Sequence, residues 1–329
     1  MSDRHSWSLR GPVKSCRLQR SWGASCADTN SCDAQPRSDE TSVWFREDGT
    51  LERRHHRNFD GSEWTSAYRY SATDRLEAVE TLNGDQLTSR RRYEYDKEGR
   101  LARIVESSGD SEWTVERLSY DSGRKHRTVE LQADKTKSDC MMFWMEETDA
   151  GYSALGATTV TFVHGQDDRP IELLFHDANG RVVGRVELTY DENRRVVEDV
   201  YHADLPPGLP DLPPTRRVHR YDDRGNRIET EMRLFGLFGP DVTRKRYNAF
   251  GDVIEETSES EQCEFNVDEK GRVSGEATNV RPARSESRFD YEYDASGNWL
   301  TKIVESRRGT ADTFRVSIIE KRTLTYYGP

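Results

Sequence analysis

The sequence predicts an all-β protein, built as an antiparallel hairpin-repeat meander that forms a long, twisted and curled sheet, either open or partly closed into a shell. Three observations predict this fold. A hairpin-like unit, YEYDKEGRLARIVE at residues 93–106, recurs in degraded copies along most of the chain. Hydrophobic residues make up only 33% of the sequence, which is less than a thick globular core needs. Helical periodicity of useful length is missing from the sequence, which leaves short strands as the simplest interpretation.

The turn of this unit has the chemistry of a tight hairpin. Asp96 is suited to the first position of a type I turn, where its carboxylate can accept a hydrogen bond from the backbone two residues on. Gly99 can adopt a positive φ without a Cβ clash and so closes a three-residue loop with a bulge. We therefore expect the two halves of the unit to pair as antiparallel strands.

The strands of the unit indicate a partly solvated sheet. Tyr93 and Tyr95 lie two residues apart and so point to one face. The bulge is expected to place Tyr95 opposite Leu101 and Tyr93 opposite Arg103. Neither face of this hairpin is purely apolar, and cross-strand aromatic and aliphatic pairs stabilise such a sheet by roughly 0.2–1 kcal/mol each.

Copies of the turn recur about every 25 residues, which predicts an array of repeats. The structural repeat turns are marked by Asp96, Gly99, Asp177, Gly180, Asp222, Gly225, Gly251, Asp268, Gly271, Asp294 and Gly297. Gly49 and Gly123 mark further copies, Asp74 and Arg194 stand where other copies have glycine, and Gly151 marks a weaker copy.

The domain organisation follows from where the repeats begin. Residues 1–41 lack strand alternation and are rich in Ser, Arg, Asp and Cys, so we expect a disordered N-terminal tail. Residues 42–329 are expected to form the array, with about ten to eleven hairpins. Residues 203–214 contain five prolines and are interpreted as an extended insertion at a hairpin tip, with a docking segment as the alternative.

Three shorter segments stand out within the array. Residues 139–144, DCMMFW, are the most apolar run and are interpreted as a buried strand or the mid-point of the array. Residues 165–170 are expected to form a turn. Residues 232–240 form a glycine-broken apolar segment that is expected to pack back on the sheet.

Charge and hydropathy exclude several classes of protein. The net charge is −11 with both signs interspersed, which disfavours non-specific binding to nucleic acid or anionic lipid. No segment approaches the roughly 20 apolar residues of a membrane span, and no apolar run follows the first methionine as it does in a secretory signal peptide. We therefore expect a cytoplasmic protein by default, with signal-independent export as the alternative.

Motifs for catalysis, cofactors or metals are missing from the sequence. The five cysteines form no CxxC and are expected to be free thiols: Cys16, Cys26, Cys32, Cys140 and Cys263. His176 and His219 stand where other copies carry aromatics, so they are interpreted as strand residues. The turns supply one carboxylate each, which is too few for calcium. We expect no enzyme activity, no catalytic residue, no cofactor and no metal.

The motif YxYDxxGR followed by Leu, Val or Ile resembles the YD repeat of the Rhs family. The segments Tyr93–Asp96 and Gly99–Leu101 match it almost fully, and Tyr291–Gly297 is close. In that family the repeats build a long sheet that spirals into a hollow shell, often around a toxin. The resemblance implies a short, stand-alone member of the family without an evident toxin domain.

Three functions are compatible with these features. The first is a non-catalytic YD-type scaffold that binds a protein or glycan partner. The alternatives are an accessory or immunity-like partner of a polymorphic toxin system, which would bind a toxin or secretion component, and an enzyme whose site is built on loops 203–214 or 232–240. The tryptophans are the candidate partner surface, with edge packing as the competing interpretation: Trp64, Trp113, Trp144 and Trp299.

Overall fold

The computed structural model describes residues 3–22, 37–121, 124–130, 142–145, 150–154, 156–203, 213–234, 239–267, 273–309 and 313–328. The elements in the first half are α1 (Asp3–Ser6), β1 (Val13–Trp22), β2 (Ser38–Phe45), β3 (Leu51–Arg57), β4 (Glu63–Tyr70), β5 (Leu76–Asn83), β6 (Gln86–Tyr95), β7 (Leu101–Ser108), β8 (Ser111–Asp121), β9 (Arg124–Glu130), β10 (Met142–Met145), β11 (Ala150–Ser153) and β12 (Ala157–His164). Those in the second half are β13 (Pro170–Asp177), β14 (Val182–Tyr190), β15 (Val196–Ala203), β16 (Thr215–Tyr221), β17 (Arg227–Arg233), β18 (Asp241–Tyr247), β19 (Val253–Val267), β20 (Val273–Tyr293), β21 (Trp299–Arg308) and β22 (Arg315–Tyr326).

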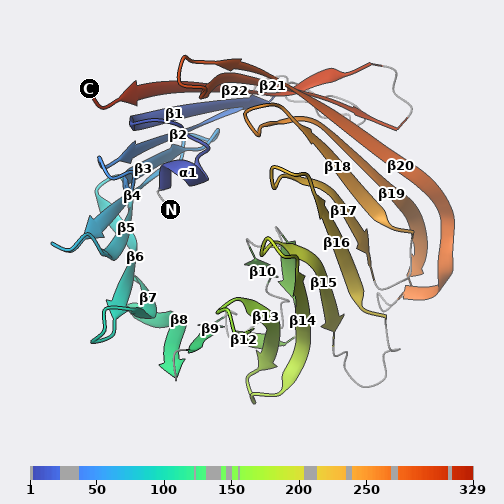
Figure 1. The fold of residues 1–329 in the computed structure, drawn as a ribbon, viewed down its shortest axis with the longest axis horizontal. Coiled ribbons are helices and arrows are strands. Elements are labelled where there is room, and N and C mark those ends of the chain that lie inside the picture. The colour runs from blue at the N-terminus through green and yellow to red at the C-terminus, as the bar shows by residue number, and fades with distance from the viewer. Residues whose placement is uncertain are drawn as a thin grey trace.

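The main sheet of these residues has 20 antiparallel strands and closes on itself (Figure 1). Each strand pairs with the next, β9 pairs with β12, and β22 pairs back with β1. The prediction of an all-β hairpin meander is therefore confirmed, and closure is complete. Strands β10 and β11 form a separate hairpin, and β10 and α1 lie on the inner side of the ring (Figure 1).

Every second hairpin turn lies on the same rim of the ring, because successive strands run in opposite directions. We call this the capped rim; its described turns are residues 46–50, 71–75, 96–100, 165–169, 191–195, 222–226, 248–252 and 294–298. In the turn of the repeat unit, the Asp96 and Gly99 amides donate to the Arg100 and Asp96 carbonyls at 2.8 and 2.9 Å. The Asp96 carboxylate also accepts a hydrogen bond from the Arg100 amide at 2.8 Å.

The residue before the end of each capped turn is left-handed, as the sequence predicts. Gly99 has φ 78°, and Asp74 and Arg194, which stand where other copies have glycine, have φ 58° and 66°. Asp168 has φ 61° and marks a copy within the turn expected at residues 165–170. Gly180 also has positive φ, but its turn joins β13 to β14 on the opposite rim.

Other predicted repeat marks have different outcomes. The copy predicted around Gly151 is wrong, because Gly151 lies within β11 opposite Trp144. Asp268, Gly271 and Gly123 lie outside the described residues. So do residues 139–141 of the apolar run, 204–212 of the proline-rich insertion and 235–238 of the glycine-broken segment.

In seven of the described hairpins, a tyrosine at or near the end of the first strand ties successive capped turns together. The Tyr95 hydroxyl donates to the Leu76 carbonyl at 2.8 Å, and the Tyr120 hydroxyl donates to the Leu101 carbonyl at 3.0 Å. The same bond joins Tyr70 to Leu51, Tyr190 to Pro170, Tyr221 to Val196, Tyr247 to Arg227 and Tyr291 to Val253. Arg100 lies 4.2 Å from the ring centroid of Tyr120, so one turn contacts the next through its arginine as well.

The predicted register of the repeat unit is correct at its turn and wrong beyond it. Tyr95 lies opposite Leu101 as expected, but Tyr93 lies opposite Ile104 rather than Arg103. The bulge leaves Ala102 unpaired, so every residue beyond it shifts by one position. Tyr93 and Ile104 therefore share a face, and Val105 lies on the other.

The disordered tail predicted for residues 1–41 is wrong for the described part of that segment. Val13–Trp22 form β1, which pairs with both β2 and β22 and completes the ring. The short segment before β1 is also fixed, because Asn298 bonds to the Arg10 amide at 2.6 Å and to its carbonyl at 3.0 Å. A buried cluster of Leu9, Val13, Cys16, Val43 and Phe45 packs beneath it.

The low content of hydrophobic residues is compatible with this fold, because most of the described sheet packs against no thick apolar core. One apolar cluster lies where β11 covers β12–β15 and includes Tyr152, Phe162 and Phe175. Elsewhere the outer face carries cross-strand ion pairs such as Arg69–Glu80 at 3.2 Å and Arg244–Glu229 at 2.8 Å, with Arg244 also paired to Glu259. Among the described residues, no helix is long and apolar enough to cross a membrane.

The left-handed turn position predicts opposite effects for two substitutions. Arg194→Gly should raise the free energy of unfolding by about 0.5–1 kcal/mol, because relief of roughly 1–2 kcal/mol of left-handed strain outweighs the added chain entropy. Gly225→Ala should lower the free energy of unfolding by about 1–2 kcal/mol, because a side chain at this left-handed position strains the backbone. The added Cβ itself causes no clash, since its nearest atom lies at 3.8 Å. Urea denaturation of both variants tests this, and changes of the same sign would contradict it.

The turn carboxylates predict a loss of stability in acid. Hydrogen bonds from the Arg181 and Arg195 amides hold the pKa of Asp177 and Asp191 below the ordinary value. A depressed folded pKa stabilises the fold above the unfolded pKa of about 3.9, and this contribution is lost as pH falls through the folded values. The urea midpoint should therefore drop between pH 5 and pH 2, and less steeply in the Asp177→Asn/Asp191→Asn variant. Parallel pH profiles for the two proteins would contradict the assignment.

Candidate functional site

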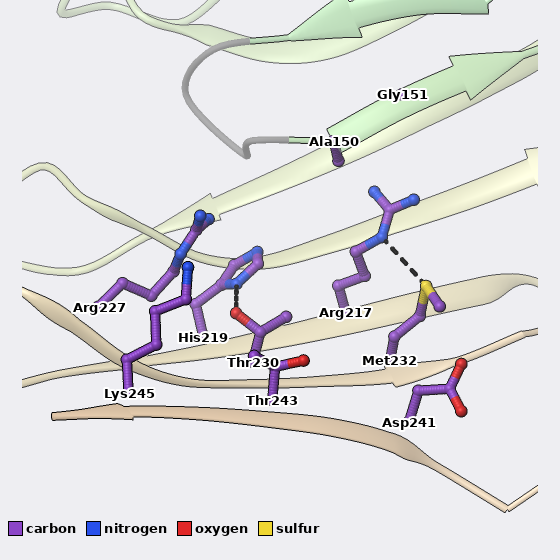
Figure 2. Close-up of a pocket in the computed structure, with 10 residues that line it drawn as sticks. All are labelled: Ala150, Gly151, Arg217, His219, Arg227, Thr230, Met232, Asp241, Thr243 and Lys245. Carbon is purple, nitrogen blue, oxygen red and sulfur yellow. Dashed lines mark hydrogen bonds between the residues drawn. The ribbon is translucent and has the colours of Figure 1, made fainter. Parts of the chain in front are cut away.

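A cavity of about 370 Å³ lies between β11 and the inner face of β16, β17 and β18 (Figure 2). Ala150 and Gly151 of β11 form one wall. The opposite wall consists of Met232 and polar side chains from three neighbouring strands. These residues alternate along each strand, except that the unpaired Ile228 separates Arg227 from Thr230 by one extra position. The hairpin registers place these residues side by side, with Arg217 opposite Met232 and Thr230 opposite both His219 and Thr243.

A buried carboxylate organises one end of this cavity. Asp199 is fully buried, and its two oxygens lie 3.0 Å from His219 Nε2 and 3.1 Å from Arg217 Nη1. His219 Nδ1 lies 3.1 Å from the Thr230 hydroxyl, and the Arg217 guanidinium lies 4.9 Å from the ring centroid of Tyr152. A buried charge requires such partners, because desolvation without them is costly.

The Asp199–His219–Thr230 chain is chemically a carboxylate, an imidazole and a hydroxyl in series. With Nε2 donating to Asp199, Nδ1 accepts the hydrogen bond of the Thr230 hydroxyl. His219 is only 3% exposed and both of its ring nitrogens are engaged. This arrangement favours a clamp that fixes the position of β16 relative to β15 and β17.

The other end of the cavity carries positive charge. Arg227 and Lys245 point toward the same space beside His219 (Figure 2). The Lys245 ammonium lies 3.4 Å from Glu256 on β19. Asp241 lies on the far side of the cavity, where burial raises the pKa of its carboxyl. The cavity therefore combines fixed cations and hydroxyls with one carboxyl whose ionisation is disfavoured.

The four candidate tryptophans are not brought together. Trp64 lines a second cavity of about 490 Å³ with Ser66, Thr81 and Asn83. Its ring centroid lies 5.4 Å from that of His56. Trp299 is 7% exposed, and the Arg322 guanidinium lies 3.5 Å from its ring centroid. Trp299 therefore packs within the protein.

Trp113 and Trp144 lie on other parts of the chain. Trp113 is half-buried on β8, opposite Glu106 of β7. Trp144 belongs to β10, and its side chain is outside the described residues. Of the three whose side chains are described, only Trp64 lines one of these two cavities.

The predicted turn residues that the structure describes form the turns of separate hairpins and do not meet in a site. Among the described residues, no group of three or more His, Cys, Asp or Glu could hold a metal ion. Cys16 is a buried free thiol whose pKa burial raises to about 11, against a smaller opposing effect of Arg322. Cys26, Cys32 and Cys140, and the side chain of Cys263, lie outside the described part of the chain.

His219 lies on a strand as its sequence pattern predicts, but its place in this cavity was not predicted. The register predicted for the repeat unit would place His219 opposite Glu229, whereas the unpaired Ile228 places it opposite Thr230. Asp199 belongs to β15, on the other side of the proline-rich insertion, and its pairing with Arg217 has no local signal in the sequence.

No protein-family model matches this sequence, and no curated protein matches it significantly. Among solved structures, the chain is similar to the Tc holotoxin pore of Photorhabdus luminescens, with 10% identity and a TM-score of 0.29, over 88% of this chain and 18% of that one. It is also similar to the TcdB2–TccC3 complex without its hypervariable C-terminal region, with 12% identity and a TM-score of 0.28, over 84% and 19%. The chain thus spans about a fifth of the length of these toxin-complex chains.

A third similar structure is a porin-like protein from Bacteroides uniformis. The identity is 10% and the TM-score is 0.31, over 96% of this chain and 98% of that one.

The buried carboxylate predicts a large loss of stability on neutralisation. Asp199→Asn should lower the free energy of unfolding by about 3–5 kcal/mol, because it leaves the largely buried Arg217 without its counter-charge. Asp241→Asn is the matched control on the same cavity and should be neutral or stabilising at pH 7, because burial already opposes its charge. Urea denaturation measures both variants, and equal destabilisation would contradict the assigned role of Asp199.

Proposed function

We propose that this chain is a non-catalytic repeat scaffold that binds a protein or glycan partner on the inner face of its closed sheet. The observation that carries the proposal is a row of half-buried hydroxyls along that face. Thr230 lies opposite Thr243, Thr243 lies opposite Ser258, and Ser258 lies opposite Ser285. Directly opposite residues share a face, so the row follows the face that lines the cavity beneath β11.

The row continues toward the seam of the ring. The Ser287 and Ser306 hydroxyls lie 3.0 Å apart, and those of Ser306 and Ser317 lie 3.3 Å apart. An inner face that served only to fill the ring would be apolar, whereas hydroxyls at partial exposure can form hydrogen bonds with a bound molecule. This composition supports a surface that recognises polar groups.

The cavity beside Trp64 supports a glycan as one class of partner. An indole ring is a flat apolar surface with one donor, and Ser66, Thr81 and Asn83 provide hydrogen-bonding groups around it. Arg54 lies 5.0 Å from the Trp64 ring centroid and 5.9 Å from that of Trp7, which fixes the edge of this surface.

The two alternative functions stay hypotheses. The YD-type turns resemble the repeats of toxin-associated shells, and this supports an accessory or immunity-like partner of a toxin system as the second candidate. An enzyme is the third candidate, and the doubly engaged imidazole of His219 favours the non-catalytic scaffold over it.

Binding by the full chain tests the proposal. Glycan-array screening and pull-down with purified candidate proteins should identify a partner of the wild-type protein. The Trp64→Ala/Thr81→Val variant should bind a glycan partner at least tenfold more weakly, because it removes the aromatic surface and a neighbouring hydroxyl. Circular dichroism and thermal unfolding confirm that the variant folds.

The control changes the opposite face of the same strands. The Arg69→Ala/Glu80→Ala variant removes an exposed cross-strand ion pair between β4 and β5 and should bind as the wild type does. Absence of any glycan or protein partner would overturn the proposed function. Equal losses in the two variants would overturn the assignment of glycan binding to the inner face.

A further inference from the structure

The cavity beneath β11 gathers cationic side chains from three adjacent strands. Arg217 comes from β16, Arg227 from β17 and Lys245 from β18, and all three line the same space (Figure 2). The strands are held in register there, because the Tyr247 hydroxyl of β18 donates to the Arg227 carbonyl at 2.8 Å. Arg217 already contacts Asp199 and Lys245 contacts Glu256, so the space carries a small excess of positive charge, which an anion between these side chains would balance.

Two of these cations, Arg217 and Lys245, are held by neighbouring side chains before any ligand arrives. Arg217 is held by Asp199 and by the ring of Tyr152, and its Nε donates to the Met232 sulfur at 3.5 Å. Lys245 is oriented by Glu256, and its side chain is 28% exposed. Groups ordered by their neighbours lose little entropy on binding, which increases affinity for a matching ligand.

The threonine hydroxyls of the cavity favour an anionic ligand that also carries hydroxyl groups. Thr230 and Thr243 lie directly opposite each other between the cationic end and Asp241. Ala150 and Gly151 leave space on the facing wall. A volume of about 370 Å³ is at the small end of the range for ligand pockets, so it suits a compact molecule.

We propose that this cavity binds the oxyanion, carboxylate or phosphate, of a small hydroxylated ligand such as a sugar acid or a sugar phosphate. Arg227 and Lys245 bind the oxyanion, and Thr230 and Thr243 form hydrogen bonds with the hydroxyl groups. This inference rests on the proposed binding function and names the chemical class of one ligand of the inner face. Arginine and lysine favour both oxyanions, so the structure defines the shared chemistry.

Isothermal titration calorimetry of the full chain tests the inference with four probes: glucuronate, glucose 6-phosphate, inorganic phosphate and glucose. Glucuronate or glucose 6-phosphate should bind at least tenfold more tightly than glucose, and the affinity should fall as salt is raised. Preference for glucuronate identifies a carboxylate ligand, and preference for glucose 6-phosphate identifies a phosphate ligand. Binding of inorganic phosphate alone would overturn the role of the threonines.

Matched variants separate the cavity from the rest of the charged surface. Arg227→Gln and Lys245→Met should each weaken binding at least tenfold. Arg233→Gln changes an exposed arginine on the same strand, paired with Glu231, and Lys97→Met changes an 89% exposed lysine in a capped turn. Both controls should bind as the wild type does. Thr243→Val retains every charge, should weaken sugar-acid binding, and serves if either charge variant fails to fold.

Two results would overturn the inference. One is equal binding of glucose and the charged probes, and the other is unchanged binding in Arg227→Gln, Lys245→Met and Thr243→Val. Neither of these two results would by itself contradict the proposed scaffold function. A glycan or protein partner lost on Trp64→Ala/Thr81→Val would still support the scaffold, even where no charged probe binds beneath β11.

Discussion

The closed sheet depends on the way each aspartate turn of the capped rim fixes one hairpin and contacts the next. The Asp96 carboxylate bonds to the Arg100 amide and to its guanidinium, while that guanidinium stacks on Tyr120 of the following hairpin. One arginine therefore belongs to two repeats. Because a slip of one residue would move every side chain of a strand to the other face, these turns determine which residues face the inside of the ring.

Features determined by local chemistry were predictable from the sequence. The left-handed positions followed from the turn template, even at Asp74 and Arg194, where a side chain replaces glycine. The error at Tyr93 marks the limit of that template. It specifies that a residue is left unpaired after the turn but does not specify which one, and leaving Ala102 unpaired places Tyr93 opposite Ile104 instead of Arg103.

Features determined by long-range pairing were not predictable in this way. The segment Val13–Trp22 lacks the alternation of a strand, yet it lies between β2 and β22, which would otherwise present unpaired edges. The candidate site has the same origin. Thr230 reaches His219 across one tight turn, whereas Asp199 reaches Arg217 only through the pairing of β15 with β16, and local turn chemistry carries no information about that pairing.

The contrast between local turn chemistry and long-range strand pairing explains how a sequence with few apolar residues can build a defined inner surface. Backbone pairing around a closed ring leaves no edge strand in the main sheet of the described residues, so much of the inner face is not required to be apolar. Hydroxyls such as Thr243 and Ser258 can then face inward at little cost, since each is bonded to the other and remains half-exposed. Asp199 differs because it is fully buried, and its partners Arg217 and His219 are consequently constrained by stability. Lys245 lines the same cavity but is 28% exposed, against 13% for Arg217, so desolvation constrains its charge less than it constrains that of Arg217.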